Sequence, residues 1–319
     1  MGTQKRTIPA VIIAVVAFFG PPGAGHHLDL FEDMRFERGF LLSYPDVAHG
    51  RSVERVLDFG KAGTRPVWRL CQWGTRYSLA DAECVHDNDE HICDNGAKRV
   101  LTGGPASPNR DLILGVHGSA EYGDSVRQRG RSWPHLLVEQ DAMELYRLDE
   151  CRRVELSISC RLLYCRNRMG DADYNPSLHA AQFQLFLIVR NINREDEECG
   201  EYYWFGVPLF DSRHAIPPGY MAKDAGKSDA TGKFIYTVDG RSLGIGSLAD
   251  GTWLTLHVDL LPFVECGLGE AVSRGYVASD TPRDYAIANM NMGWEIPGTF
   301  DAAFQVRDLR ISAVLDNRQ

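Results

Sequence analysis

The chain has 319 residues, of which 44% are hydrophobic and 24% charged, with 31 glycines, 15 prolines and a formal net charge of −9. This composition excludes collagen-like, low-complexity disordered and polytopic membrane proteins. Nucleic acid is not an expected partner, because phosphate contacts need clustered lysine and arginine and the chain has no basic stretch. The length allows one large β domain or two average ones.

The first 25 residues have the pattern of a secretory signal peptide. Lys5 and Arg6 precede the apolar run 10–19, and small residues follow at 23–25. The run is too short to cross a bilayer, so it predicts export and cleavage, with an uncleaved anchor as the alternative. We therefore expect a secreted or periplasmic protein with no membrane insertion after cleavage.

The eight cysteines all lie in the predicted mature part of the chain. Cys84–Cys93 and Cys160–Cys165 are near enough in sequence to close short loops, but spacing does not define the whole connectivity. Cys84 and Cys93, with the two histidines between them, also form a metal-ligand pattern, C-x-H-x4-H-x-C. That spacing is not a common zinc pattern and an exported protein meets an oxidising compartment, so a disulfide is the favoured prediction.

A calcium loop is suggested by Asp171, Asp173 and Asn175, which offer oxygen ligands at alternate positions. An EF-hand needs glycine next and glutamate at position 182, where this chain has Pro176 and Gln182. A looser structural Ca²⁺ site, in this loop or at Asp87 and Asp89, is the hypothesis, and no other metal or cofactor is predicted.

The alternation of β-strands recurs along the mature chain. In residues 182–190, apolar Phe183, Leu185, Leu187 and Val189 alternate with polar side chains. The same pattern predicts strands at 66–73, 133–139, 156–165, 202–210, 233–238, 253–260, 287–292 and 303–314. The last of these changes phase near residues 307–308, which predicts a β-bulge.

Helical periodicity is convincing only at 261–274, and residues 84–132 are interpreted as a loop-rich insertion. Many short strands with almost no helix predict an all-β, two-sheet antiparallel jelly-roll sandwich with long loops and one short helix. Its size suits the lectin or glucanase type. Residues 26–319 are expected to form a single domain.

The polar positions of these strands combine aromatic rings, amides and a few charges. Such sets suit sugars, whose C–H faces stack on rings while their hydroxyls bond to amides and carboxylates. The candidate ligand-binding residues are Trp133, His135, Arg161, Gln182, Gln184, Tyr202, Trp204, Asp211, Arg213, Trp253, His257, Asp259, Asn289, Asn291 and Glu295. The alternatives are a covered structural face and, for Asp211 and Arg213, a simple ion pair that braces a turn.

A second signal is the E-x-D-x-x-E spacing of Glu139, Asp141 and Glu144, shortly after Trp133-Pro134. Here the sequence resembles the laminarinase-type retaining glycoside hydrolases, a jelly-roll family. The resemblance implies that Glu139 is the nucleophile, Asp141 the assisting carboxylate and Glu144 the acid/base. Retaining chemistry needs two carboxyls about 5–5.5 Å apart. On a flat strand Glu144 points away from Glu139, so a bulge after Asp141 would have to bring it back.

The sequence therefore predicts an exported β-sandwich that recognises a polysaccharide or oligosaccharide on a polar, aromatic sheet face. One alternative is a retaining glycoside hydrolase that uses Glu139 and Glu144. The other is a structural cell-surface protein whose aromatic residues belong to the core.

Overall fold

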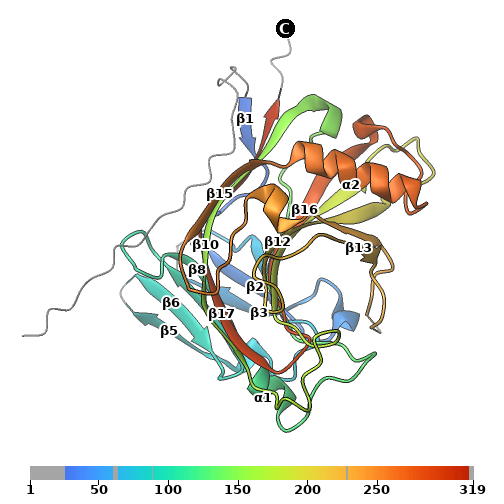
Figure 1. Cartoon of the computed structure of the whole chain (residues 1–319). Helices are drawn as coiled ribbons and strands as arrows, with labels where there is room; N and C mark the ends of the chain where they lie inside the picture. Colours follow the sequence, from blue (N-terminus) through green and yellow to red (C-terminus); the bar gives the residue numbers. More distant parts are fainter. Residues whose placement is uncertain (1–25, 60–63, 88, 228, 316–319) are drawn as a thin grey trace, which may run out of the picture.

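The structure is a computed structural model that describes residues 26–59, 64–87, 89–227 and 229–315. The predicted signal peptide lies outside the described residues. Two large β-sheets, called sheet A and sheet B below, pack face to face around a shared apolar core (Figure 1). The predicted fold class, an all-β two-sheet sandwich, is confirmed.

Sheet A contains eight strands in the order β15-β10-β17-β8-β7-β6-β5, with β1 paired to β17. The strands are β1 (His26–Asp29), β5 (Glu83–Asp87), β6 (Glu90–Asp94), β7 (Lys98–Gly103), β8 (Asp111–His117), β10 (Cys151–Asn167), β15 (Leu254–Asp259) and β17 (Phe300–Leu315). The two long strands β10 and β17 pair with each other over most of their length and form the centre of this sheet.

Sheet B contains nine strands in the order β13-β14-β12-β11-β16-β9-β4-β2-β3. The strands are β2 (Gly39–Ser43), β3 (Val53–Asp58), β4 (Trp68–Cys71), β9 (His135–Asp141), β11 (Gln182–Asn191), β12 (Tyr202–Asp211), β13 (Tyr220–Lys223), β14 (Phe234–Thr237) and β16 (Tyr285–Glu295). The sheet is antiparallel except for the parallel pairs β2–β4 and β12–β14.

The helices are few and short. Their bounds are α1 (Gly118–Tyr122), α2 (Leu261–Ser273) and the 3₁₀ turns η1 (Val47–His49), η2 (Leu79–Asp81), η3 (Leu148–Glu150), η4 (Gly240–Leu243) and η5 (Pro282–Asp284). The helix predicted at 261–274 is α2, which packs on β10 of one sheet and on β12 and β14 of the other (Figure 1). Among the described residues, no helix combines the length and the apolar character needed to cross a membrane.

The alternation of each strand decides which side chains enter the core. On β11 the side chains of Phe183, Leu185, Leu187 and Val189 are fully buried, and they point toward sheet A. Their polar neighbours, residues 182, 184 and 190, therefore point to the outer face of sheet B. This is the same division that the sequence pattern predicts.

The β-bulge predicted in the last strand is present. Ser157 pairs with Arg310 and Ser159 with Arg307, so β17 has one residue more than β10 between these pairs. Asp308 takes the positive φ of 52° there, and its backbone N–H donates to Asp111 Oδ2 at 2.8 Å. An aspartate tolerates this left-handed conformation better than most residues, which explains the phase change at this point.

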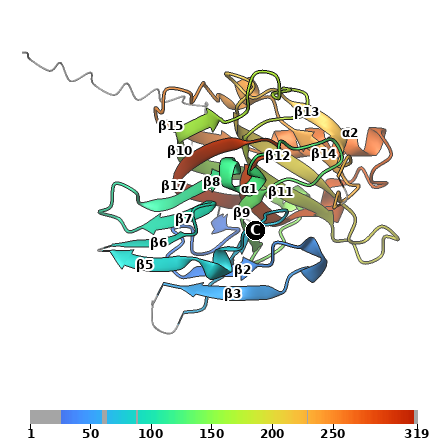
Figure 2. The same cartoon turned by 90° about the horizontal axis from the view of Figure 1, so that it is seen from below.

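Residues 84–132 differ from the loop-rich insertion expected for them. The first part of the segment forms β5, β6, β7 and β8, which extend sheet A beyond β17, beside β2 and β3 of the other sheet (Figure 2). The polar run 87–90 is only the tip of the β5–β6 hairpin. Buried Val100, Leu112 and Leu114 anchor β7 and β8 in the core, although the average composition of the segment is polar.

Candidate functional site

The structure divides the predicted ligand-binding residues between the two sheets. Arg161 lies on β10, His257 and Asp259 lie on β15, and Trp253 directly precedes β15. Their strands belong to sheet A, and their side chains alternate with buried residues, so they face outward from that sheet. The prediction that they share one face with the other candidates is wrong, because their strands joined the opposite sheet.

Two of these residues have evident structural roles. The indole of Trp253 lies 4.7 Å from the guanidinium of Arg161 and 4.3 Å from that of Arg307. Cations over an aromatic face are attracted electrostatically to the ring, so the two guanidinium groups hold the Trp253 side chain in position. Asp259 accepts hydrogen bonds from the backbone N–H groups of Val154 and Leu261 at 3.0 and 3.1 Å, and so holds the start of α2. Neither group is free to bind a ligand without losing these partners.

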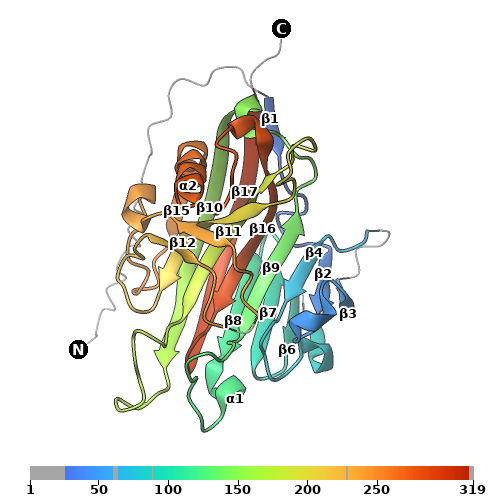
Figure 3. The same cartoon turned by 90° about the vertical axis from the view of Figure 1, so that its right-hand side faces the viewer.

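The other predicted residues come from sheet B, on the neighbouring strands β9, β16, β11 and β12 (Figure 3), with Trp133 just before β9 and Arg213 just after β12. Strand register sorts them into rows across the outer face. The first row contains His135, Glu295, Gln182 and Asp211. Further along the strands, a second row contains Glu139, Asn291 and Phe186. The row after that contains Asp141, Asn289, Ile188 and Trp204. Side chains in these rows share one face, because residues two apart on a strand point the same way.

The first row ends in a closed group that we call the Glu295 cluster. Trp133 Nε1 donates to Glu295 Oε2 at 2.9 Å, and His135 Nε2 lies 3.6 Å from the same carboxylate. Lys227 Nζ lies 3.3 Å from His135 Nε2 and 4.4 Å from the centre of the Trp133 ring, while Arg127 lies 4.6 Å from that ring. Trp133 is therefore occupied by two cations and is not an open stacking platform.

The electrostatics of the Glu295 cluster favour an anchor over a reacting group. Burial alone raises the pKa of Glu295, but the hydrogen bond and charge of His135, with Lys227 and the indole of Trp133, outweigh it and hold the pKa at about 2. The carboxylate thus stays ionised over the ordinary pH range. Sequence reasoning missed Lys227, because it lies 92 residues from His135 and no local pattern marks it.

Asp211 and Arg213 brace the end of β12. Arg213 donates to both oxygens of Asp211, through Nε at 2.9 Å and Nη2 at 2.5 Å, and Gln182 Nε2 donates to Asp211 at 2.9 Å. Burial raises the pKa of Asp211, but the bonds and charge of Arg213 outweigh it and lower the pKa. Asp211 and Arg213 therefore form the ion pair that braces the turn, the alternative to a ligand site, and Gln182 supports this pair.

A second group, the carboxylate cluster, lies at the other end of the face. Arg51 donates to both oxygens of Asp141, at 3.0 and 2.7 Å, and its Nη2 lies 3.7 Å from Glu139 Oε1. Arg69 Nε lies 3.4 Å from the same Glu139 oxygen, and Asn289 Nδ2 donates to Asp141 at 3.0 Å. The two arginines come from β4 and from the β2–β3 connection, and the sequence pattern did not single them out.

The two carboxyls of this cluster are close together and have opposite pKa shifts. Burial raises the pKa of Glu139, whose side chain is 13% exposed, and the charges of Arg69 and Arg51 offset this only in part. Burial also raises the pKa of Asp141, but its bonds to Arg51 and Asn289 outweigh that effect and lower it. Because both contact one nitrogen of Arg51, their oxygens lie no more than about 6.5 Å apart, close to the spacing of a retaining pair.

Glu144 does not belong to the carboxylate cluster. β9 ends at Asp141, and the backbone N–H of Met143 donates to the carbonyl of Leu30, so the chain leaves the middle of sheet B before Glu144. Glu144 is exposed and accepts a hydrogen bond from the Tyr146 hydroxyl at 2.8 Å. The bulge that would return it to the face of Glu139 is not formed, and this contradicts the pairing implied by the family resemblance.

Beside the carboxylate cluster lie amide groups with unfilled hydrogen-bonding capacity, next to aromatic rings. Asn289 Oδ1 is buried and accepts no hydrogen bond. The side-chain amides of Asn291, which is 5% exposed, and of half-buried Gln184 take part in no hydrogen bond with the described residues. Phe186 lies edge-to-face with Trp204, with ring centres 5.9 Å apart. These five residues make up what we call the amide–aromatic strip.

Tyr202 continues the aromatic part of the strip along β12. Its ring lies edge-to-face with that of Trp204, with centres 5.7 Å apart, and Lys233 Nζ lies 5.0 Å from the Tyr202 ring. Trp204 Nε1 donates to the hydroxyl of Thr231 at 3.3 Å. The rings are therefore held in position from one side, while Trp204 and Tyr202 stay partly exposed.

The predicted calcium loop is an exposed turn. Asp171 and Asp173 are exposed, and Asn175 Oδ1 accepts the backbone N–H of Ser177 at 2.9 Å. Across residues 26–59, 64–87, 89–227 and 229–315, no group of three or more His, Cys, Asp or Glu side chains is placed to hold a metal ion. The Ca²⁺ site remains a prediction without a ligand set.

One of the two suggested disulfides is formed. Cys84 and Cys93 are bonded, as predicted. Cys160 and Cys165 are free thiols on the same strand, β10. Residues five apart on a strand are separated by roughly 17 Å, so this pair cannot bond and the prediction for it is wrong.

Comparison with known proteins gives no family assignment. The chain matches no protein-family model and no curated protein sequence. Similar solved structures include a thermostable cellulase derived from that of Rhodothermus marinus (13% identity, TM-score 0.37, 76% of this chain and 98% of that one). Two others are the family 12 xyloglucanase of Bacillus licheniformis (8%, 0.39, 73% and 97%) and the family 11 xylanase of Neocallimastix patriciarum (7%, 0.37, 73% and 95%). The likeness concerns the arrangement of strands, and at these identities it does not identify shared site residues.

Proposed function

We propose that the outer face of sheet B binds a carbohydrate, a polysaccharide or an oligosaccharide, and that the protein is exported to do so. The observation that carries this proposal is the amide–aromatic strip, where amides with unfilled hydrogen-bonding capacity adjoin partly exposed rings on one sheet face. Amides match sugar hydroxyls, and rings match sugar C–H faces. The signal-peptide pattern of residues 1–25 supports the export.

The buried carbonyl of Asn289 defines one end of the binding surface. An unsatisfied buried acceptor costs about 1–3 kcal/mol, and a ligand hydroxyl that donates to it, once the neighbouring side chains move aside, removes this cost. Asn291 lies two residues after Asn289 on β16 and faces the same side. Phe186 is its register partner on the neighbouring strand β11. A sugar chain lying across the strands would contact the amides on β16 at one end and the Trp204 ring on β12 at the other.

The proposal predicts that Trp204→Ala weakens polysaccharide binding at least about fivefold, because stacking on a ring contributes on the order of 1 kcal/mol or more. The measurement is a binding isotherm of the mature protein against cellulose, xyloglucan, xylan and laminarin. Trp253→Ala is the matched control, since its ring lies on the other sheet between Arg161 and Arg307. Equal losses in both variants, or binding to none of these polymers, would contradict the proposal.

The carboxylate cluster favours a second candidate function, retaining glycoside hydrolysis through Glu139 and Asp141. Neighbouring carboxyls whose pKa values are shifted apart can divide the roles of acid and nucleophile. Ionised Asp141 would attack the anomeric carbon while protonated Glu139 gives its proton to the leaving oxygen; Glu139 would then take a proton from the water that releases the sugar. Arg51 has to move away from Asp141 first, and its side chain is 59% exposed.

This second candidate predicts release of reducing ends from a bound polysaccharide, with a loss of at least about a thousandfold in Glu139→Gln and Asp141→Asn. Glu144→Gln is the control and should retain full activity. The rate should rise as pH passes the lowered pKa of Asp141 and fall as pH passes the raised pKa of Glu139, since the reaction needs the first ionised and the second protonated. Binding without any release of reducing ends would eliminate the hydrolase and leave the binding function.

A further inference from the structure

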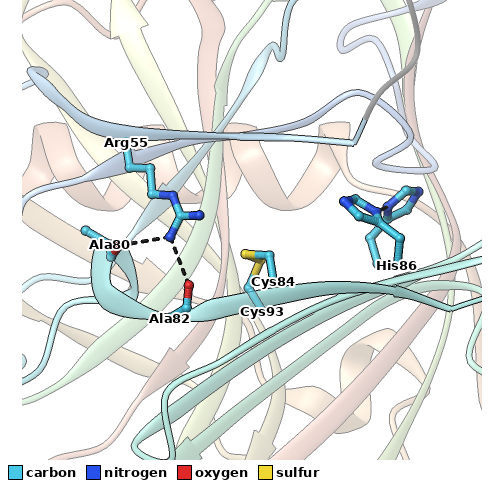
Figure 4. The surroundings of a disulfide bond; sticks show 7 residues. Arg55, Ala80, Ala82, Cys84, His86 and Cys93 are labelled. Carbon is cyan, nitrogen blue, oxygen red and sulfur yellow. Dashed lines mark hydrogen bonds between the residues drawn. A yellow bond between two sulfur atoms is a disulfide. The ribbon is translucent and has the colours of Figure 1, made fainter.

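The β5–β6 hairpin places four residues of metal-binding types, two cysteines and two histidines, on one face. Cys84 pairs with Cys93 and His86 pairs with His91 in the antiparallel register. Residues two apart on a strand share a face, so the four side chains form a two-by-two patch. Figure 4 shows the disulfide and His86 on the side of the hairpin that faces the strand carrying Arg55.

The two imidazoles already point at one another. His86 Nδ1 is in contact with His91 Nδ1, and the ring centres are 4.5 Å apart with planes at 81°. Two ring nitrogens in contact can share only one proton, so at least one of them has a lone pair directed at the space between the two rings. Phe59 stacks on His91 at 4.4 Å and fixes the orientation of that ring.

The patch has room for an ion. All four residues line a cavity of about 270 Å³ between the hairpin and β3. Arg55, the nearby cation, donates to the carbonyls of Ala80 and Ala82 at 2.8 and 2.9 Å, so its position is held by the backbone (Figure 4). The Cα atoms of Cys84 and Cys93 are 4.2 Å apart, which places their two sulfur atoms at one end of the patch.

We propose that this hairpin is a redox-gated site for a divalent ion of the zinc class. With the disulfide closed, only the two imidazoles are available, which is why the described residues show no complete ligand set. A dithiol reductant gives two electrons and two protons to the S–S bond and is itself oxidised to a disulfide. The ion then displaces the two thiol protons and is held by two thiolates and two imidazoles, the Cys₂His₂ set of tetrahedral zinc sites.

The hairpin geometry supports convergence of these four ligands. Cross-strand partners adjoin each other, and the Cys and His pairs are separated by two residues, or roughly 7 Å along the strands. Side chains of this length reach a common point over such a distance, with metal bonds of about 2.0–2.3 Å. The disulfide therefore closes the same site that reduction would open.

The test is a Co²⁺ titration of the full chain before and after reduction with a phosphine. Co²⁺ is used because thiolate ligation gives an intense ultraviolet charge-transfer band, and Zn²⁺ should then displace it. We expect the reduced protein to bind about one Co²⁺ with this band, and the oxidised protein to show no such band.

Variants separate this site from the other thiols. Cys84→Ser and the double variant His86→Ala/His91→Ala should weaken Co²⁺ binding at least about a hundredfold. Cys266→Ser, which removes an exposed free thiol, is the matched control and should leave binding unchanged. Circular dichroism of each variant checks that the sandwich is folded. Three results would overturn the proposal: no binding after reduction, equal binding with the disulfide intact, or a charge-transfer band that persists in the double histidine variant.

Discussion

Replacing Lys98 by methionine is expected to lower the free energy of unfolding by about 3–5 kcal/mol. Lys98 Nζ lies 2.7 Å from Glu121 Oε1, and the two side chains are 0% and 1% exposed. Methionine has a similar volume but no charge, so the Glu121 carboxylate would stay buried without its cation. The Lys98 ammonium also donates to the carbonyl of Tyr77, so a second buried polar group would lose its partner.

Urea denaturation of the variant, followed by circular dichroism, measures this loss. The double variant Lys98→Met/Glu121→Leu should recover much of it, because no buried charge remains. Arg274→Ala is the surface control: its pair with Glu270 is exposed, and exposed helix pairs contribute only about 0.3–0.5 kcal/mol. A Lys98→Met loss as small as that of Arg274→Ala would show that water solvates Glu121.

Replacing Trp294 by alanine is expected to lower the free energy of unfolding by about 3–5 kcal/mol. Its ring is fully buried and meets those of Phe183, Phe210 and Phe304 edge-on, with centres 5.2, 6.0 and 6.0 Å apart. Its Nε1 donates to the carbonyl of Leu114 at 2.9 Å, so one side chain of β16 joins sheet B to β8 of sheet A. Alanine leaves a cavity and an unpartnered carbonyl between the sheets.

Trp294→Phe separates the two contributions, because it keeps an aromatic ring and removes the indole donor. We expect its loss in urea denaturation to lie between those of the alanine variant and the wild type. Trp253→Ala, on the outer face of sheet A, should cost less than about 1 kcal/mol. If Trp294→Ala and Trp253→Ala cost the same, the indole would not be the link between the sheets.

Local periodicity made much of the fold predictable. The alternation in residues 182–190 placed Gln182 and Gln184 opposite the buried side chains of β11, where the structure has them. The phase change near Asp308 marked a bulge, and the pattern at 261–274 marked a helix. These features depend on residues a few positions apart, so a single strand or helix carries the whole signal.

The candidate site was only partly predictable, because its composition depends on contacts between distant segments. Arg51 contacts Asp141 across 90 residues, and Lys227 contacts His135 across 92. No spacing rule connects such residues, and both arginines of the carboxylate cluster were missed for this reason. Glu144 shows the opposite error. The sequence motif predicted that it faces the same side as Glu139, but β9 ends at Asp141 and Glu144 lies in an exposed loop.

By itself, the sequence determined which side of each strand is apolar, and therefore which rings and amides face outward. The tertiary structure alone decided which sheet each strand joins: Trp204 and Trp253 have the same alternation, yet the first lies on sheet B and the second adjoins β15 of sheet A. The reason is physical. The pleat repeats every two residues and is set by the backbone of one strand. Sheet membership is set by hydrogen bonds to other strands, and in the β10–β17 and β9–β16 pairs the bonded residues are more than a hundred positions apart.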